Sequence, residues 1–211
     1  MQIVGRDAEI AELETVLEAV AGGERRLVVV RGEAGIGKTC LLAWLASLAQ
    51  QRRLEPFRGR ATELETDVPL ALFREALPDL AAVPDGGAEG RWQLSRTVGD
   101  LLASRGRFVA VLDDVHWADP VSRELLETLV RRPPAVAHLI VVGSRPGAVA
   151  DALVVAARSA GRPASVLDLA PLSRPAADEL VGGDWSEADR SRMFETSGGN
   201  PLFLEELARA E

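Results

Sequence analysis

Residues 27–39 constrain the fold of this chain more than any other stretch. The valine-rich run Leu27–Val30 breaks into a glycine-rich loop that ends on Lys38 and Thr39, with the spacing GxxxxGK[ST] of a phosphate-binding P-loop. A coincidental glycine-rich turn would need neither a buried strand before it nor a helix after it. Here both flanks are present, because apolar residues recur at helical spacing after the loop, at Leu41, Leu42, Leu45, Ala46, Leu48 and Ala49. The pattern therefore favours a true P-loop.

The residue types of this loop point to phosphate and Mg²⁺ as ligands. Glycine adopts backbone angles that are closed to other residues, so successive N–H groups can turn inward toward one anion. Lys38 can reach the β- and γ-phosphates of a nucleotide, and the Thr39 hydroxyl is a hard oxygen ligand suited to Mg²⁺. We predict that the nucleotide contacts Gly32, Gly35, Ile36, Gly37, Lys38, Thr39 and the backbone of Cys40.

Composition and charge narrow the class of protein. The 211 residues can form one sizeable core, and 47% apolar with 27% charged residues is ordinary for a soluble globular protein. Acidic residues outnumber Lys and Arg by 32 to 24, which gives a net charge of −8, so we expect no direct binding of nucleic acid. The apolar runs are too short to span a bilayer and no signal peptide opens the chain, so we expect no membrane partner.

The single cysteine, Cys40, indicates the compartment. One cysteine cannot form an intramolecular disulfide, and a reducing cytoplasm is therefore expected. We expect its thiol to be packed and inert, the alternative being a redox role.

A second buried-looking strand, Phe108–Leu112, ends in the carboxylates Asp113 and Asp114. A solvated strand end is one interpretation, because burying carboxylates in a core is unfavourable. Downstream of a P-loop, the other interpretation is a Walker B element, in which Asp113 orders the water shell of the Mg²⁺ held by Thr39. Asp114 would then orient or deprotonate the water that attacks the γ-phosphate.

Four further residues lie near predicted strand ends. Arg145 follows the strand Leu139–Ser144, where it is placed either to sense a γ-phosphate or to form a surface ion pair. Trp117 is expected to pack, and the role of His116 stays open. His138, which lies in an apolar run, is expected to be structural.

Alternating strands and helices predict an α/β fold with parallel pairing. We expect a three-layer P-loop NTPase domain over residues 1–170, with a mostly parallel central sheet and a first helix capped by Asp7. A small helical lid follows over residues 171–211, with helices at 175–181, 186–196 and 201–210. Its apolar residues Leu202, Phe203 and Leu207 need a partner surface, and the chain ends four residues after Leu207. We therefore expect a truncated lid within a longer polypeptide.

Together these motifs resemble the nucleotide-binding domain of STAND-class signal-transduction ATPases, which are relatives of the AAA+ ATPases of the ASCE division. The most similar group is the N-terminal ATPase of the large ATP-binding LuxR-type transcriptional regulators. The resemblance spans nearly the whole chain and is carried by five segments in order, at residues 4–9, 32–39, 112–119, 143–145 and 198–207.

The resemblance implies further roles. Val4, Gly5 and Arg6 would line the adenine pocket, Arg145 would be a sensor arginine on the γ-phosphate, and Pro201 would belong to the lid that closes over the base. Such proteins are typically ATP/ADP switches that work with downstream domains of the same polypeptide and self-associate in the ATP form. Many strongly hydrolytic relatives carry Glu where this chain has Asp114, which implies slow turnover.

Two other functions remain open from the sequence. One is a nucleotide-dependent scaffold for assembly with little hydrolysis. The other is a replication-initiator type of AAA+ ATPase that binds DNA, which the acidic charge disfavours.

Overall fold

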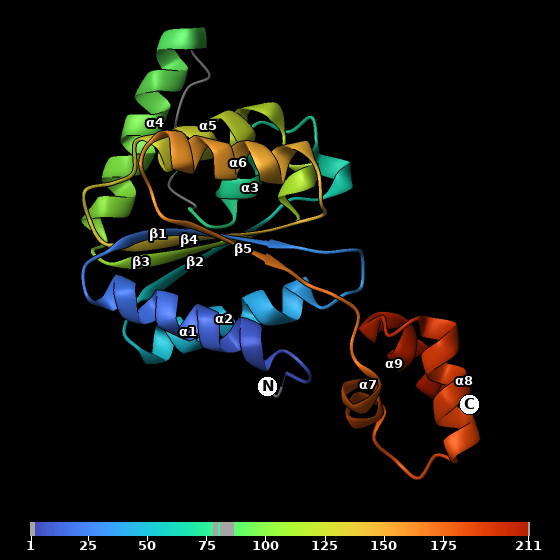
Figure 1. The fold of residues 1–211 in the computed structure, drawn as a ribbon. Helices are drawn as coiled ribbons and strands as arrows, with labels where there is room; N and C mark the ends of the chain where they lie inside the picture. Colours follow the sequence, from blue (N-terminus) through green and yellow to red (C-terminus); the bar gives the residue numbers. More distant parts are fainter. Residues whose placement is uncertain (1–2, 78–79, 81–86, 211) are drawn as a thin grey trace.

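The computed structural model describes residues 3–77, 80 and 87–210, the side chains of residues 87–89 and 91 excepted. Its centre is one sheet of five strands in the order β2-β3-β4-β1-β5, and each neighbouring pair is parallel (Figure 1). The strands are β1 (Arg25–Arg31), β2 (Glu55–Arg60), β3 (Phe108–Asp113), β4 (His138–Ser144) and β5 (Ala164–Asp168). The α/β prediction with a parallel sheet is confirmed.

Helices cover both faces of the sheet and make the predicted three layers (Figure 1). One face carries α1 (Asp7–Ala21) and α2 (Lys38–Gln51), and the other carries α3 (Ala71–Arg74), α4 (Gly87–Ser104), α5 (Pro120–Arg131) and α6 (Ala148–Ser159). Successive strand residues point to opposite faces, so Val28 and Val30 of β1 pack under α1 and α2 while Leu27 and Val29 pack on the other side. This two-sided burial explains why the three inner strands β1, β3 and β4 are nearly continuous apolar runs, whereas the edge strand β2 carries charged residues and alternates between buried and exposed positions.

Asp119 caps the N-terminus of α5. Asp119 accepts hydrogen bonds from the N–H groups of Val121 and Ser122 at 3.0 and 2.9 Å, and Pro120 opens the helix. The same oxygen accepts the N–H of Leu70 at 3.2 Å, which joins the segment before α3 to α5.

The predicted cap of the first helix is wrong. Arg6, not Asp7, is the N-cap residue of α1, and it makes no capping bond through its side chain. Its guanidinium is instead buried against the P-loop, where it donates to the carbonyl of Ile36 at 3.0 Å. Asp7 is the first helical residue, where its charge favours the positive end of the helix dipole.

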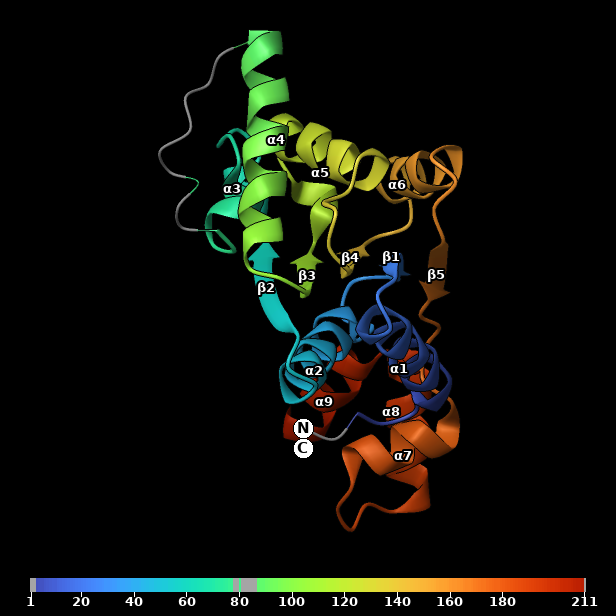
Figure 2. The ribbon, with the colours of Figure 1, turned by 90° about the vertical axis from the view of Figure 1, so that its left-hand side faces the viewer.

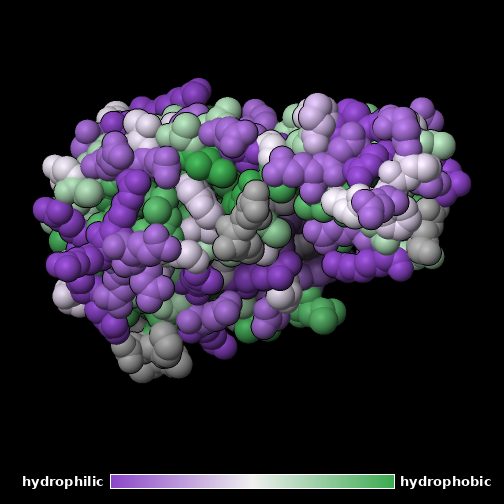
Figure 3. Space-filling view, turned by 90° about the horizontal axis from the view of Figure 1, so that it is seen from below, coloured by the Kyte–Doolittle hydropathy of each residue, from purple (hydrophilic) through white to green (hydrophobic). Residues whose placement is uncertain are grey.

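Beyond β5 the chain forms three short helices, α7 (Arg174–Val181), α8 (Glu187–Ser197) and α9 (Pro201–Ala210), close to the ranges expected from the sequence. Figure 2 shows them gathered on the α1 and α2 side of the sheet. Within the described residues, no helix is both long and apolar enough to cross a membrane. The surface that α1, α2 and these helices present in Figure 3 is predominantly hydrophilic.

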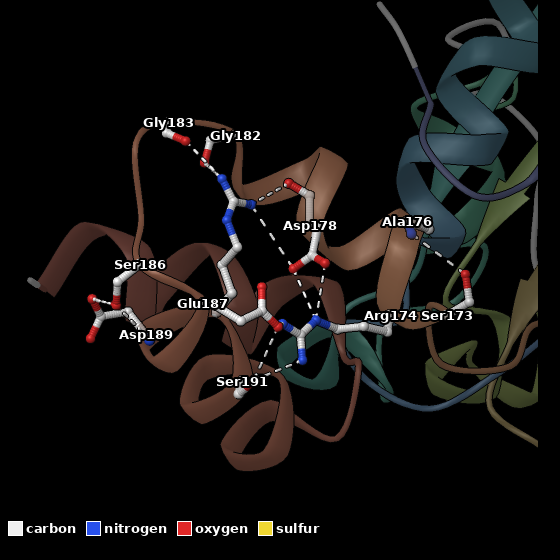
Figure 4. A network of polar contacts seen from close by, with 11 residues as sticks. Ser173, Arg174, Ala176, Asp178, Gly182, Gly183, Ser186, Glu187, Asp189 and Ser191 are labelled. Atoms are coloured by element: carbon white, nitrogen blue, oxygen red, sulfur yellow. Dashed lines mark hydrogen bonds and ion pairs between the residues drawn. The ribbon is translucent and has the colours of Figure 1, made fainter.

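Two arginines tie α7 and α8 into one body (Figure 4). Arg174 donates from Nε to both carboxylate oxygens of Asp178, at 3.1 and 3.0 Å, and from Nη2 to Glu187 at 2.8 Å. Arg190 donates to the carbonyls of Asp178 and Gly183, at 3.1 and 2.7 Å. The three helices and the segment before α7 also share a small apolar core, which consists of Leu172, Ala176, Ala177, Met193 and Leu204. The three helices, called the lid below, therefore have a core of their own.

Candidate nucleotide site

A cavity of about 370 Å³ opens at the carboxyl edge of the sheet, between the P-loop, the ends of β3 and β4, and the start of α9. Its lining brings together residues that are far apart in the sequence: Ala34, Gly35, Gly37, Lys38, Thr39, Cys40, Arg60, Asp114, His116, Trp117, Arg145, Pro201, Leu202 and Glu205. Eight of the predicted site residues are among them. This edge is where ligands of open parallel sheets bind.

Two P-loop glycines require left-handed backbone angles. Gly35 has φ +75° and Gly37, the N-cap of α2, has φ +102°. Gly32 is needed for space instead, because a Cβ there would lie 2.6 Å from Cγ2 of Ile36. The N–H of Gly32 donates to the carbonyl of Ser144 at 3.2 Å, which fixes the start of the loop to the end of β4.

Lys38, the first residue of α2, is buried. Its Nζ donates to the carbonyls of Gly32 and Glu33, both at 2.8 Å. Burial lowers the pKa of Lys38, while the nearby Asp114 and Asp113 act in the opposite direction. An ammonium group has three donors, so one remains for a phosphate oxygen.

Thr39 and Asp113 meet behind the loop. The Thr39 hydroxyl donates to Oδ2 of Asp113 at 2.6 Å, and Oδ1 of Asp113 accepts the N–H of Asp114 at 2.9 Å. Asp113 is buried, and Gly143 of β4 leaves room for its carboxylate, since a Cβ there would lie 2.5 Å from Oδ1. One hydroxyl and one carboxylate suit Mg²⁺, which takes few protein ligands and completes its shell with phosphates and water. In the described parts of the chain, no three His, Cys, Asp or Glu side chains cluster to bind a metal.

Asp114 forms an ion pair that the sequence analysis did not predict. It follows β3 in a left-handed conformation with φ +52°, and its Oδ2 accepts from Nε and Nη2 of Arg60 at 3.2 and 3.0 Å. Arg60 ends β2, which pairs with β3 so that Arg60 lies beside Asp113. The signal in the sequence is a cation at the end of the short segment that forms β2, but the order of the strands is needed to place it beside Asp114.

Arg145 extends from the end of β4 into the cavity. The guanidinium carbon of Arg145 lies 6.0 Å from the ring centre of Trp117. The backbone N–H of Arg145 points to Nδ1 of His116, at a distance of 3.5 Å. Over the residues that the structure describes, its guanidinium has no carboxylate partner. A free cation at this place is available to an anionic ligand.

The lid touches the P-loop directly. Asn200, the residue before α9, donates from Nδ2 to the carbonyl of Ala34 at 2.9 Å, and the N–H of Leu202 points to the carbonyl of Gly35 at 3.3 Å. Asn200 also caps α9, accepting the N–H of Leu202 at 3.1 Å. These contacts place Pro201 at the cavity.

The predicted adenine-pocket residues lie next to the cavity rather than in its lining. Val4 packs on the apolar core of the lid, and Gly5 approaches α7 so closely that a Cβ would lie 2.5 Å from that of Ala176. Arg6 holds the carbonyl of Ile36, as described above. The N-terminal segment therefore joins the P-loop to the lid.

One site prediction needs correction. The thiol of Cys40 is not packed: it is exposed and lines the cavity. The buried face of α2 consists of Leu41, Leu42, Leu45, Ala46 and Ala49 with Lys38, and position 40 lies off that face.

Comparisons with known proteins agree with this geometry. Residues 2–142 match the AAA ATPase domain family. A curated relative, "Uncharacterized protein R02095" of Rhizobium meliloti (strain 1021), is 26% identical over 260 residues, with 98% of this chain and 25% of the relative covered. The chain therefore spans about a quarter of that relative's length.

Three solved structures show the same fold. The Aeropyrum pernix Orc1 protein in complex with DNA is similar at a TM-score of 0.70 and 19% identity, over 99% of this chain and 59% of that one. Cdc6p from Pyrobaculum aerophilum gives 0.66 and 19%, over 97% and 61%. AMPPCP-bound DnaA from Aquifex aeolicus gives 0.59 and 16%, over 98% and 60%. The family match, which covers the P-loop and Asp113, shows that this chain belongs to the AAA ATPase domain family.

Proposed function

We propose that this chain binds ATP and ADP with Mg²⁺, hydrolyses ATP slowly, and acts as a nucleotide-dependent switch in a signal-responsive transcriptional regulator of the LuxR type. The observation that carries the proposal is the contact of Thr39 with Asp113 at 2.6 Å, behind a cavity that Lys38, Asp114 and Arg145 also line. A P-loop hydroxyl and a strand-end carboxylate in contact form the metal-binding half of an ATPase site.

The side chains divide the work of binding and hydrolysis. The P-loop N–H groups and Lys38 would bind the β- and γ-phosphates, and Arg145 would contact the γ-phosphate from the opposite wall. Thr39 and Asp113 would hold Mg²⁺, which when bound neutralises charge on the phosphate oxygens. Asp114 would direct a water molecule toward the γ-phosphate. The protein contributes mainly positioning and charge.

The state of Asp114 supports slow turnover. Its Oδ2 accepts hydrogen bonds from two N–H groups of Arg60, so this oxygen is engaged and the carboxylate is held toward β2. An aspartate is also one methylene shorter than glutamate and reaches less far toward the water. Release of Arg60 would free Oδ2 as well and would let the carboxylate turn toward the water, which should speed hydrolysis.

The contacts of the lid support a switch. Asn200 and Leu202 bond the P-loop carbonyls of Ala34 and Gly35, and Gly5 packs on α7. A change of the P-loop on nucleotide exchange would therefore reach the lid without any intermediate element. In a longer polypeptide, such a movement would be passed to the following domains.

A replication initiator is the second candidate, because the Orc1 structure is a complex with DNA. Against it stands the net charge of −8, since sequence-independent binding to DNA depends on concentrated positive charge. Binding of a DNA duplex that weakens steeply as the salt concentration rises would favour this candidate over the regulator.

Titration calorimetry of the chain with ATP and with ADP, each with and without Mg²⁺, tests the proposal. Phosphate release is then measured on the same sample. Micromolar or tighter binding that Mg²⁺ strengthens, followed by slow release, is expected. Tight binding with no release above that of Asp114→Ala would favour the scaffold, and the absence of binding would refute the nucleotide function.

A further inference from the structure

His116 lies in a short turn that follows Asp114 and contacts Arg145. Asp114 and Arg145 are the two residues proposed to act on the γ-phosphate. His116 is the middle residue of η3 (Val115–Trp117), which directly follows Asp114 and lies against β4. The left-handed backbone of Asp114 turns the chain at this point, so that the imidazole faces the end of β4.

The imidazole reaches the backbone of Arg145. Its Nδ1 accepts the backbone N–H of Arg145 at 3.5 Å, a long hydrogen bond, and such bonds at an unliganded site can shorten when a ligand binds. On the other side, the carbonyl of Arg145 accepts the hydroxyl of Ser144 at 2.9 Å. The backbone of Arg145 is thus held between its own strand and the turn that follows Asp114.

A purely structural role explains this ring poorly. Its Nε2 is buried and has no hydrogen-bond partner among the described residues, which is an unfavourable state for a polar atom. The ring contacts Trp117 at a centroid distance of 5.2 Å, a packing contact that an apolar ring could make without this cost. What the imidazole supplies here, and an apolar ring would not, is the acceptor at Nδ1.

The surroundings keep that acceptor available. Burial lowers the pKa of His116, and the positive charges of Arg145 and Lys38 act in the same direction, while Asp114 and Asp113 oppose them. A neutral imidazole carries a lone pair on Nδ1 when its proton is on Nε2, and this is the tautomer that can accept from Arg145.

We propose that His116 is a positioning residue that fixes Arg145 relative to Asp114 and thereby sets the preference of the site for ATP over ADP. The inference rests on the proposed function, because Arg145 is assigned there to the γ-phosphate. Trp117 complements it, since its ring lies beside the guanidinium while His116 holds the backbone. With the acceptor removed, Arg145 would lose its position, and ATP would lose a contact that ADP never makes.

Three variants separate the acceptor from the ring. His116→Asn places an amide oxygen at the position of Nδ1 and keeps the bond. His116→Gln places its amide near Nε2 instead, and His116→Leu keeps bulk without any acceptor. We expect Leu and Gln to lower the ratio of ATP to ADP affinity about fivefold, the effect of one ordinary hydrogen bond, because the bond would shorten in the ATP state; Asn should retain the ratio.

The measurement is calorimetry of each variant with ATP and with ADP in the presence of Mg²⁺, alongside a thermal unfolding curve. An unchanged ratio in Leu and Gln, or an equal loss for both nucleotides, would overturn the role of His116 while leaving the nucleotide function intact. If Leu does not fold, the comparison of Gln with Asn decides. A wild-type chain that binds neither nucleotide would instead refute the proposed function itself.

Discussion

The contact between the lid and the P-loop can be tested with Gly35→Ala. Gly35 has φ +75°, and a Cβ on it would lie 2.8 Å both from Oδ1 of Asn200 and from Cβ of Leu202. The methyl group would therefore displace the start of α9, and the hydrogen bonds from Asn200 to Ala34 and from Leu202 to Gly35 would be lost.

The expected magnitude follows from these contacts. Each hydrogen bond contributes about 1 kcal/mol, so the docked lid loses about 2 kcal/mol relative to the undocked one. This raises the undocked population about 30-fold. The left-handed conformation itself destabilises an alanine by about 1 kcal/mol. This strain is present in both the docked and the undocked state, so it does not change the equilibrium between them.

Gly37→Ala is the matched control. Gly37 has φ +102°, yet a Cβ there meets no atom within 4 Å, so this variant carries the backbone strain without the clash. Hydrogen exchange of the amides in the first turn of α9, measured without nucleotide, should accelerate in Gly35→Ala and not in Gly37→Ala. Equal exchange in the two variants would show that the lid is not held by these P-loop contacts.

Three further changes have defined outcomes. Lys38→Ala should weaken ATP binding in calorimetry about 100-fold while the fold persists in circular dichroism, because a charged donor to phosphate is lost from a helix end; equal affinity would refute the site. Arg60→Ala should raise the rate of phosphate release about fivefold, because it frees Asp114 from a partly exposed ion pair; an unchanged rate would show that this pair does not limit turnover. Burial lowers the pKa of His138 to about 4 from its ordinary 6.5, so the unfolded chain binds a proton first as the pH falls. The folded state should lose about 3 kcal/mol between about pH 6.5 and 4 in urea titrations, and His138→Leu should lack this contribution.

The parts of the site that lie within one continuous segment could be predicted from the sequence. The P-loop and the acidic end of β3 are each a strand followed by candidate site residues, so local patterns predict Lys38, Thr39, Asp113 and Asp114 together. Their meeting in space also follows, because parallel strands bring their carboxyl ends to one edge.

Contacts between segments could not be predicted in the same way. Arg60 meets Asp114 only because β2 is the neighbour of β3, and the bond from Asn200 to Ala34 joins residues 166 positions apart. Neither distance is contained in a local pattern, since both depend on the strand order and on where the lid folds back.

The two wrong predictions had local reasons that tertiary contacts changed. Asp7 has the right residue type for a cap, but Arg6 takes that position because its guanidinium binds the P-loop. Cys40 was judged by the apolar character of cysteine, yet it shares the solvent-exposed face of α2 with Ser47 and Gln50, at helical spacings of seven and ten residues. That spacing was visible in the sequence.

The adjacent carboxylates Asp113 and Asp114 show how one strand end can separate recognition from turnover. Asp113 is the last residue of β3 and is buried between Thr39 and the space left by Gly143, so we expect it to keep its position while a nucleotide binds or leaves. Asp114 turns away in a left-handed conformation and meets Arg60 on the rim of the cavity, where a partly exposed ion pair is weak enough to be exchanged.

After Asp114 the chain continues into the turn in which His116 contacts Arg145. A change at Arg60 should therefore alter the rate of hydrolysis with little effect on affinity, whereas a change at His116 should alter the choice between ATP and ADP. The proposed switch would need this separation, because the ATP state would have to be recognised and held for longer than a fast hydrolase would allow.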